Sequence, residues 1–298
     1  MDSLIANLIS PYYIKIFTLV GIYIIIALGL NFITGVTGQL SFGHAAFVSI
    51  GAYTAAILTT RLQLPFLASL LLGGLLAALV GILLGFPILR LTGDYLGIAT
   101  LGFCEIVIVV FQNTEITGGT IGLSGIAKNT SLTLVFILVV ITIWSMYRLQ
   151  NSRFGRALLA IREDEIAAHV MGINTTAYKI QAFGIGTFFA GIGGGLYAHM
   201  IQYLNPTDFG FSRSFDYLTF VVLGGLGSIP GTVLGTTILT LAPEFLRFVD
   251  EYRMMIYGAL MVTMMIFRPK GLLGGVDLAK AIHALKQKNK KNTLSGDA

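Results

Sequence analysis

Charged residues are scarce in this chain. Asp, Glu, Lys and Arg together make up 11% of its 298 residues, whereas they make up about 25% of an average soluble domain. Uncharged runs extend over residues 16–60, 62–89, 129–147, 180–207 and 217–243. Because one membrane span takes roughly 20 apolar residues, the sequence predicts an integral membrane protein with several helices and excludes an ordinary soluble domain.

The chain also lacks the residue patterns that catalysis or metal binding would need. Its one cysteine, Cys104, excludes an intramolecular disulfide. The four histidines are too scattered for a recognisable metal site, and no Ser/His/Asp arrangement is legible; they are His44, His169, His199 and His283. No G-x-x-x-x-G-K-[ST] phosphate loop is present. We therefore predict no catalytic or metal-binding residues and no cofactor in this chain, and any use of ATP would need another subunit.

The positive charge that is present gathers in two segments. Of the 19 Lys and Arg residues, 12 lie in residues 148–179 or in residues 268–291. By the positive-inside rule both segments should be cytoplasmic, so the net charge of +5 indicates topology and not nucleic-acid binding. The first apolar run is too long for a signal peptide of the usual kind and has no basic region before it. It predicts a retained transmembrane helix over residues 12–33. Further spans are predicted over residues 66–89, from near Tyr95, and over residues 132–149, about 180–201 and about 252–268, with Arg213 in the loop after the span at 180–201.

Glycine interrupts the apolar pattern once in each half of the chain. Residues 35–53 keep their hydrophobicity but contain several glycines, and residues 224–231 read GGLGSIPG. Irregular backbone at membrane depth is tolerated only where protein or a watery cavity covers it. Residues 35–60 are therefore predicted to contain a broken or closely packed helix, as a re-entrant pair or one crossing. If both basic segments are cytoplasmic, residues 215–247 must enter and leave on one side, which predicts a re-entrant hairpin.

These interruptions supply most of the candidate residues for a translocation pathway, because paired breaks of this kind mark transport sites in proteins with internal repeats. Close helix packing explains the same glycines, and an interhelical hydrogen bond explains the same polar groups. Glu105, the single acidic residue in the apolar run after Tyr95, could face the pathway, lie near a helix end, or be protonated and hydrogen-bonded. The candidates are Gly38, Gln39, Ser41, His44, Glu105, Gly224 and Gly227.

Residues 148–179 form the long hydrophilic interruption between the two apolar halves. A helix is predicted from about Gly155 to Met171, ended by Gly172 in a left-handed conformation, with Asn174 capping the next helix. This stretch could serve only to orient the protein in the bilayer. Its acidic cluster, residues 163–165, is not needed for orientation and favours a surface that receives a partner.

Several separate stretches, in order along nearly the whole chain, resemble one known family. They are TGQLSFGHAAFVSIGAYTAA, GDYLGIATLGFCEI, SRFGRALLAIREDEIAAHVMGIN, GIGGGLYAHM, VVLGGLGSIPGTVLG and FRPKGLLG. The chain is similar to the LivM-like permease subunits of bacterial ABC importers for branched-chain amino acids. This resemblance implies an all-α polytopic membrane helix bundle with about eight apolar segments, including broken or re-entrant helices and a cytoplasmic coupling helix.

The resemblance also implies partners and a coupling site. Such permeases pair with a second homologous permease, two cytoplasmic ATPase subunits that bind ATP, and an extracytoplasmic solute-binding protein. A cytoplasmic loop docks into the ATPase. Here that loop contains an E-I-A-A sequence with one residue more than the family pattern, so Ala168 and Gly172 match it more securely than Glu165. The coupling residues that follow are Gly155, Arg156, Arg162, Glu163, Glu165, Ala167, Ala168 and Gly172.

The expected protein is thus a transport subunit and not an enzyme. Residues 1–275 form the transmembrane permease domain, with the coupling loop at 148–179, and residues 276–298 form a basic cytoplasmic tail. It sits in the lipid of the bacterial inner membrane and moves leucine, isoleucine and valine into the cytoplasm by alternating access. A permease of the same family for urea or short amides is the alternative, and an ATPase-independent carrier or channel is a further one.

Overall fold

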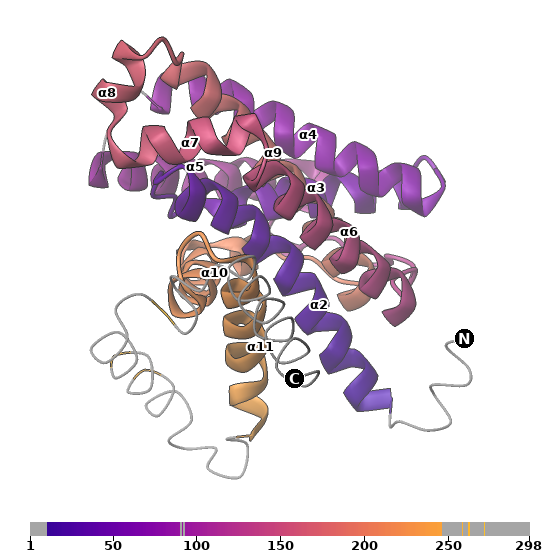
Figure 1. The fold of residues 1–298 in the computed structure, drawn as a ribbon. Helices are drawn as coiled ribbons and strands as arrows, with labels where there is room; N and C mark the ends of the chain where they lie inside the picture. The colour runs from indigo at the N-terminus through magenta and orange to yellow at the C-terminus, as the bar shows by residue number, and fades with distance from the viewer. Residues whose placement is uncertain are drawn as a thin grey trace, which may run out of the picture.

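The fold is an all-α bundle in the computed structural model, which describes residues 11–89, 91, 93–245, 258, 262 and 271. Its long helices are α2 (Pro11–Asn31), α3 (His44–Thr60), α4 (Phe66–Ile88), α5 (Asp94–Gln112), α6 (Leu132–Gln150) and α9 (Thr175–Ile201). Two short helices, α7 (Arg153–Glu163) and α8 (Glu165–Val170), connect α6 to α9. The described part ends, apart from three single residues, with α10 (Phe211–Gly224) and α11 (Ile229–Phe245). In Figure 1, α7 and α8 lie together at one end of the bundle.

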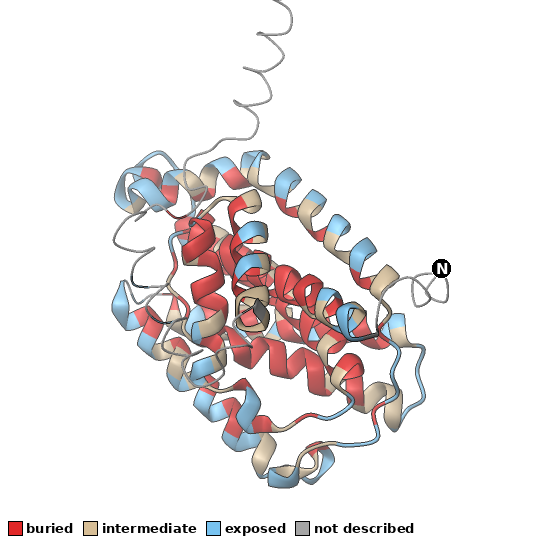
Figure 2. Cartoon of the chain, turned by 90° about the horizontal axis from the view of Figure 1, so that it is seen from below, coloured by how far each residue is buried: buried red, intermediate tan, exposed pale blue. Residues whose placement is uncertain are grey.

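Helix α9 is the element against which α2, α3 and α4 pack. Its sequence is rich in glycine, and glycine lets helix backbones approach closely inside a membrane protein. A Cβ added at Gly194 would lie 2.0 Å from the Val48 carbonyl oxygen of α3. One added at Gly191 would lie 2.7 Å from the Ala77 Cβ of α4. Figure 2 shows the resulting concentration of buried residues in the middle of the bundle.

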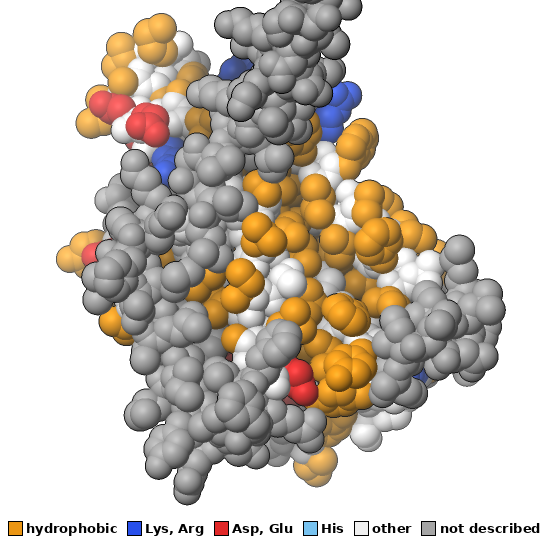
Figure 3. Space-filling view, turned by 60° about the horizontal axis from the view of Figure 1, so that its bottom comes forward, with side chains coloured by type: hydrophobic (Ala, Val, Ile, Leu, Met, Phe, Trp, Pro, Cys, Tyr) orange, Lys and Arg blue, Asp and Glu red, His pale blue; other side chains and the backbone are white. Residues whose placement is uncertain are grey.

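The outer helices present apolar faces to their surroundings. Leu75, Leu79 and Leu83 recur every four residues along α4, and all three are exposed, which is the pattern of a helix with one face toward lipid. Figure 3 shows hydrophobic side chains over most of the described surface in that view, with few charged groups among them. An exposed apolar surface of this extent requires lipid or protein to cover it.

Four helices of the described part are long and apolar enough to cross a membrane. They are Tyr12–Val36, Phe66–Ile88, Asp94–Gln112 and Leu132–Gln150, and α3 is a shorter apolar helix. The predicted spans over residues 12–33, 66–89 and 132–149 and the one near Tyr95 are therefore confirmed as helices. The expected total of about eight apolar segments is confirmed only to this extent. The predicted last span, residues 252–268, and the tail from residue 276 lie outside the described residues, except for Gly258 and Val262.

The predicted break near residue 35 is confirmed. Helix α2 widens into a π-helix, η1 (Phe32–Val36), and residues 37–43 are not helical before α3 begins. The re-entrant hairpin predicted for residues 215–247 is confirmed as a pair of helices: α10 and α11 pack on each other, and the chain turns at Gly225 and Gly227, which both have positive φ. That the pair enters and leaves the membrane on one side stays a prediction. Arg213, expected in the loop before the hairpin, lies inside α10.

Candidate functional site

Helix α7 starts close against the end of α6. The Ser152 side chain caps it by accepting a hydrogen bond of 3.2 Å from the Gly155 backbone N–H, which satisfies one of the free donors of the first turn. A Cβ added at Gly155 would lie 2.2 Å from the Gln150 carbonyl oxygen. The sequence-predicted Gly155 is thus the residue that permits the sharp connection between α6 and α7.

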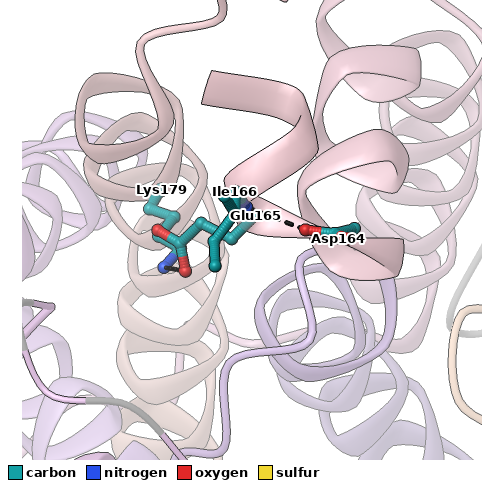
Figure 4. A network of polar contacts seen from close by, with 4 residues as sticks. All are labelled: Asp164, Glu165, Ile166 and Lys179. Atoms are coloured by element: carbon teal, nitrogen blue, oxygen red, sulfur yellow. Dashed lines mark hydrogen bonds and ion pairs between the residues drawn. The ribbon is translucent and has the colours of Figure 1, made fainter. Parts of the chain in front are cut away.

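The predicted single helix from Gly155 to Met171 is wrong, because the chain breaks at Asp164. This residue is extended, with φ of −155° and ψ of 108°. Its carboxylate accepts a hydrogen bond of 2.9 Å from the backbone N–H of Ile166 (Figure 4). It accepts a second one, of 3.0 Å, from the backbone N–H of Ala167. Aspartate favours this N-cap geometry over a mid-helix position, so α8 begins as a separate helix.

The end of α8 follows the prediction. Gly172 has a φ of +85°, the left-handed conformation in which glycine ends a helix at no steric cost. The Asn174 side chain then accepts a hydrogen bond of 3.1 Å from the Ala177 N–H and caps α9. The segment is therefore two short helices, each with a side-chain cap at its start, and not a continuous rod.

An ion pair fastens α8 to α9. The Lys179 ammonium lies 2.5 Å from a Glu165 carboxylate oxygen, and the exposed fraction of the side chain is 10% for Lys179 and 41% for Glu165. Figure 4 shows the two side chains meeting between the helices. Because Glu165 points toward α9, it orients α8 within this chain. Lysine is rarely buried without such a partner.

The exposed side of α8 carries large apolar side chains beside His169. Ile166, Val170 and Met171 have exposed fractions of 78%, 79% and 81%, although they lie in the most hydrophilic stretch of the chain. The predicted coupling residue Ala168 is buried, whereas Ala167 and Glu163 are exposed. The sequence prediction omitted these three apolar residues as site candidates. Ile166 and Val170 lie four residues apart on α8 and Met171 follows directly after it, and this spacing was the available signal.

Arg162 links α7 to the first glycine-rich break. One of its guanidinium nitrogens, Nη1, donates a hydrogen bond to the Gly35 carbonyl at the end of η1. A Cβ added at Gly38, the next glycine of the break, would lie 3.1 Å from the Arg162 Cγ. Arg156, by contrast, donates at 3.0 Å to the nearby Asn151 carbonyl of its own segment. The two arginines, both predicted as coupling residues, therefore have different surroundings.

The second glycine-rich break meets the first at the same place. The Gly227 backbone N–H donates a hydrogen bond of 2.8 Å to the Asn31 side-chain oxygen of α2. The Gly227 carbonyl accepts one of 2.9 Å from the Gln150 side chain at the end of α6. A Cβ added at Gly35 would lie 2.2 Å from the Gly227 nitrogen. We call the five residues Asn31, Gly35, Gln150, Arg162 and Gly227 the glycine junction.

Two members of the glycine junction, Asn31 and Gln150, were not predicted from the sequence. Asn31 is the one side chain with an amide between Ile16 and Gly38 in an uncharged run. An isolated amide in a membrane helix usually finds a hydrogen-bond partner on another element, so that position carried a signal. Gln150 carried none, because it lies among the polar residues at the end of α6.

The polar candidates just after the first break are buried. Gln39, Ser41 and His44 are almost wholly inaccessible. Within the described part of the chain, the Gln39 amide atoms, the Ser41 hydroxyl and the His44 Nδ1 have no hydrogen-bond partner. The other His44 nitrogen, Nε2, lies 3.3 Å from the Ile26 carbonyl oxygen. Buried polar groups normally have hydrogen-bond partners. The polar atoms of these three side chains are therefore available to bind a further group.

The remaining pathway candidates lie elsewhere. Gly224 belongs to the hairpin, where a Cβ would lie 2.3 Å from the Gly231 carbonyl oxygen, so its small size permits α10 and α11 to pack. Glu105 lies in the middle of α5 on the exposed side of the helix. The structure thus brings Gly38 and Gly227 to Arg162 but directs Glu105 away from the interior of this chain.

Comparison with known proteins decides the family. The model of the family described as "Branched-chain amino acid transport system / permease component" matches residues 12–265. The chain belongs to this family. It is also 41% identical to the high-affinity branched-chain amino acid transport system permease protein LivM of Salmonella typhimurium, and equally to that of Escherichia coli K12; each alignment covers 89% of this chain and 71% of the relative.

More distant members align over similar lengths. The permease protein BraD of Pseudomonas aeruginosa is 28% identical, over 87% of this chain and 93% of its own length. No solved structure matches the chain. Family membership and the apolar helices together make the chain an integral membrane protein of a transport family. Its named relatives are transport permeases and not enzymes, and the described residues contain no cluster of three side chains suited to a metal ion.

Proposed function

We propose that this chain is the permease subunit of an ATP-driven importer that moves branched-chain amino acids into the cytoplasm by alternating access. The names of the relatives support the substrate class, and the absence of a phosphate loop in the sequence supports ATP binding by partner subunits rather than by this chain. The observation that carries the coupling role is the hydrogen bond from Arg162 of α7 to Gly35. It joins the surface segment directly to the interrupted helices.

The complex that this function requires has five subunits. The chain pairs with a second homologous permease, two cytoplasmic ATPases contact the α7 and α8 side, and a solute-binding protein delivers substrate from the other side. The arginines of the α6 to α9 connection support a position of this segment on the cytoplasmic face of the bacterial inner membrane, and the positive charge of the C-terminal sequence supports the same side for the tail. The exposed apolar side of α8 is the surface that an ATPase cleft would cover.

The proposed coupling works by moving α7 and α8 as one body. They are fastened to α9 by Glu165 and Lys179 and to the glycine junction by Arg162. When ATP brings the ATPases together, the displaced α7 shifts the Gly35 and Gly227 backbones, and the breaks beside them reorient. Each nucleotide state must contact α8 differently, since only a difference in binding free energy shifts a conformational equilibrium.

Reconstitution tests the proposal and its alternatives together. The chain would be placed in vesicles with a partner permease, the two ATPases and the binding protein, and uptake of leucine, isoleucine, valine and urea compared with and without ATP. The proposal predicts ATP-dependent uptake of the three amino acids and little of urea. Uptake dominated by urea or a short amide would assign the alternative substrates. Uptake that persists without the ATPases would indicate a carrier or channel and overturn the proposal.

A further inference from the structure

A groove runs between three helices on the outer side of the bundle. Helix α9 forms its floor, α4 forms one wall through Ala78 and Ile82, and α6 forms the other through Trp144. Its volume is about 690 Å³. The groove exists because α4 packs on α9 and α3 whereas α6 packs on α2, so the two walls flank α9 without closing over it.

The groove is apolar along its length and basic at one end. From Gln181 to Phe189 it follows α9, a distance of about 12 Å at 1.5 Å per residue. Arg148, on the last turn of α6, lines the end of the groove next to the α7 connection. Apart from Ser145, Gln181 and Arg148, the side chains that line it are apolar or glycine. An amphiphile with a negative headgroup matches this distribution of polarity.

Arg148 is held over an aromatic ring and has no acidic partner among the described residues. Its guanidinium carbon lies 5.9 Å from the centre of the Trp144 ring, within the range of a cation–π interaction. Neither ion pair of the described part of the chain involves Arg148. Tryptophan is also the residue that concentrates at the level of lipid headgroups. The cation is thus positioned at the membrane interface with its charge available.

The walls of the groove belong to helices that face out of the chain. Of the most apolar stretch of α6, 22% is buried, and of that of α4, 33%, against 78% for the segment Tyr12–Val36. Basic pockets between membrane helices on the cytoplasmic side favour anionic lipid headgroups. We propose that this groove binds an anionic phospholipid, with its headgroup phosphate on Arg148 and an acyl chain along α9 between Ile82 and Trp144.

The lipid site adjoins the coupling segment. Arg148 precedes by two residues Gln150, which donates to Gly227 in the glycine junction, and α7 begins five residues after Arg148. A bound headgroup would therefore fix the end of α6 from which α7 departs. The binding inference itself does not depend on the proposed transport function, and its test needs neither ATP nor a substrate.

Trp144 makes the test direct, because it is the only tryptophan in the chain. The full chain is reconstituted in vesicles that mix phosphatidylglycerol and phosphatidylcholine, with bromine on the acyl chains of one lipid or the other, and quenching of tryptophan fluorescence is measured. We expect phosphatidylglycerol to be preferred about fivefold, which corresponds to the ~1 kcal/mol that one cation contributes near an anionic surface.

Three variants separate this site from general attraction of basic surfaces. Arg148→Gln should reduce the preference to about one, and Arg148→Lys should keep most of it. Arg153→Gln removes an exposed arginine of α7 outside the groove and should leave the preference unchanged. A ratio near one in the unaltered chain, or a preference retained by Arg148→Gln, would overturn the proposal. No quenching by either brominated lipid would overturn it too, because protein would then cover the groove.

Discussion

Gly35 and Gly227 bring two segments that are distant in the sequence into close contact. Besides the contact with the Gly227 nitrogen, a Cβ at Gly35 would lie 2.2 Å from the Asn31 side-chain oxygen. Gly227 has a φ of +81°, a conformation that other residues adopt only with strain. Gly35 therefore needs to be glycine because of packing and Gly227 because of its backbone conformation, whatever the chain transports.

Gly35→Ala should destabilise the protein by about 1–3 kcal/mol, the usual cost of overpacking a tight interior site. The check is thermal unfolding of the purified full chain in detergent. Gly102→Ala is the matched control, because nothing lies within 4 Å of a Cβ added there and alanine favours a helix more than glycine does. If the two variants melted at the same temperature, the close contact between the breaks would be incorrect.

Asp164 makes two helices where one was predicted, and it sets the geometry of the coupling segment. Asp164→Ala removes both side-chain hydrogen bonds to the start of α8 and should cost about 0.5–2 kcal/mol of local stability. Hydrogen exchange of the α8 amides measures this, and we expect it to become several-fold faster. Asp164→Ser should restore most of the protection. Glu163→Ala, which removes the neighbouring exposed carboxylate, should leave exchange unchanged; equal exchange in both alanine variants would argue against the cap.

The long helices could be predicted because their signal is local. The starts expected for α4, at residue 66, and for α5, near Tyr95, agree with Phe66 and Asp94, since an apolar run of span length needs no tertiary information. The break at Asp164 could not be predicted in this way. The apolar spacing of Leu159, Ile166 and Val170 continues across it, and the choice of two helices is supported by the ion pair between Glu165 and Lys179.

The candidate site was predictable only in part, because its residue types are a local signal whereas its contacts depend on tertiary structure. Single residues such as Arg162 and Gly227 stand out by type, because charge and glycine are conspicuous beside apolar spans. The contacts between these residues could not be predicted. Arg162 and Gly35 are separated by 127 positions, and no local sequence pattern indicates that they meet. The outward direction of Glu105 likewise depends on how α5 packs, which its sequence period alone leaves open.

Assembly of the whole transporter should depend on the exposed side of α8. Met171→Ser removes an apolar side chain that a partner would bury, which is worth about 1.5–3 kcal/mol for full burial. We therefore expect the affinity for the ATPase subunit to fall about tenfold or more, as measured by binding to the reconstituted permease pair. Ile121→Ser is the control, because Ile121 is equally exposed, at 82%, but lies in η3 (Gly119–Ile121), in the loop between α5 and α6. Equal losses in both variants would exclude α8 as the docking surface.

The central claim is that Arg162 transmits the motion of α7 and α8 to the two glycine-rich breaks. The most direct measurement is the number of leucine molecules imported per ATP hydrolysed by the reconstituted complex, for Arg162→Gln and for the control Arg61→Gln. Arg61 also donates to a distant backbone carbonyl, that of Ile116, but takes no part in the glycine junction. We predict that Arg162→Gln still assembles and hydrolyses ATP while import per ATP falls at least tenfold, and that Arg61→Gln behaves as the unaltered chain. Unchanged import per ATP in assembled Arg162→Gln complexes would contradict the account.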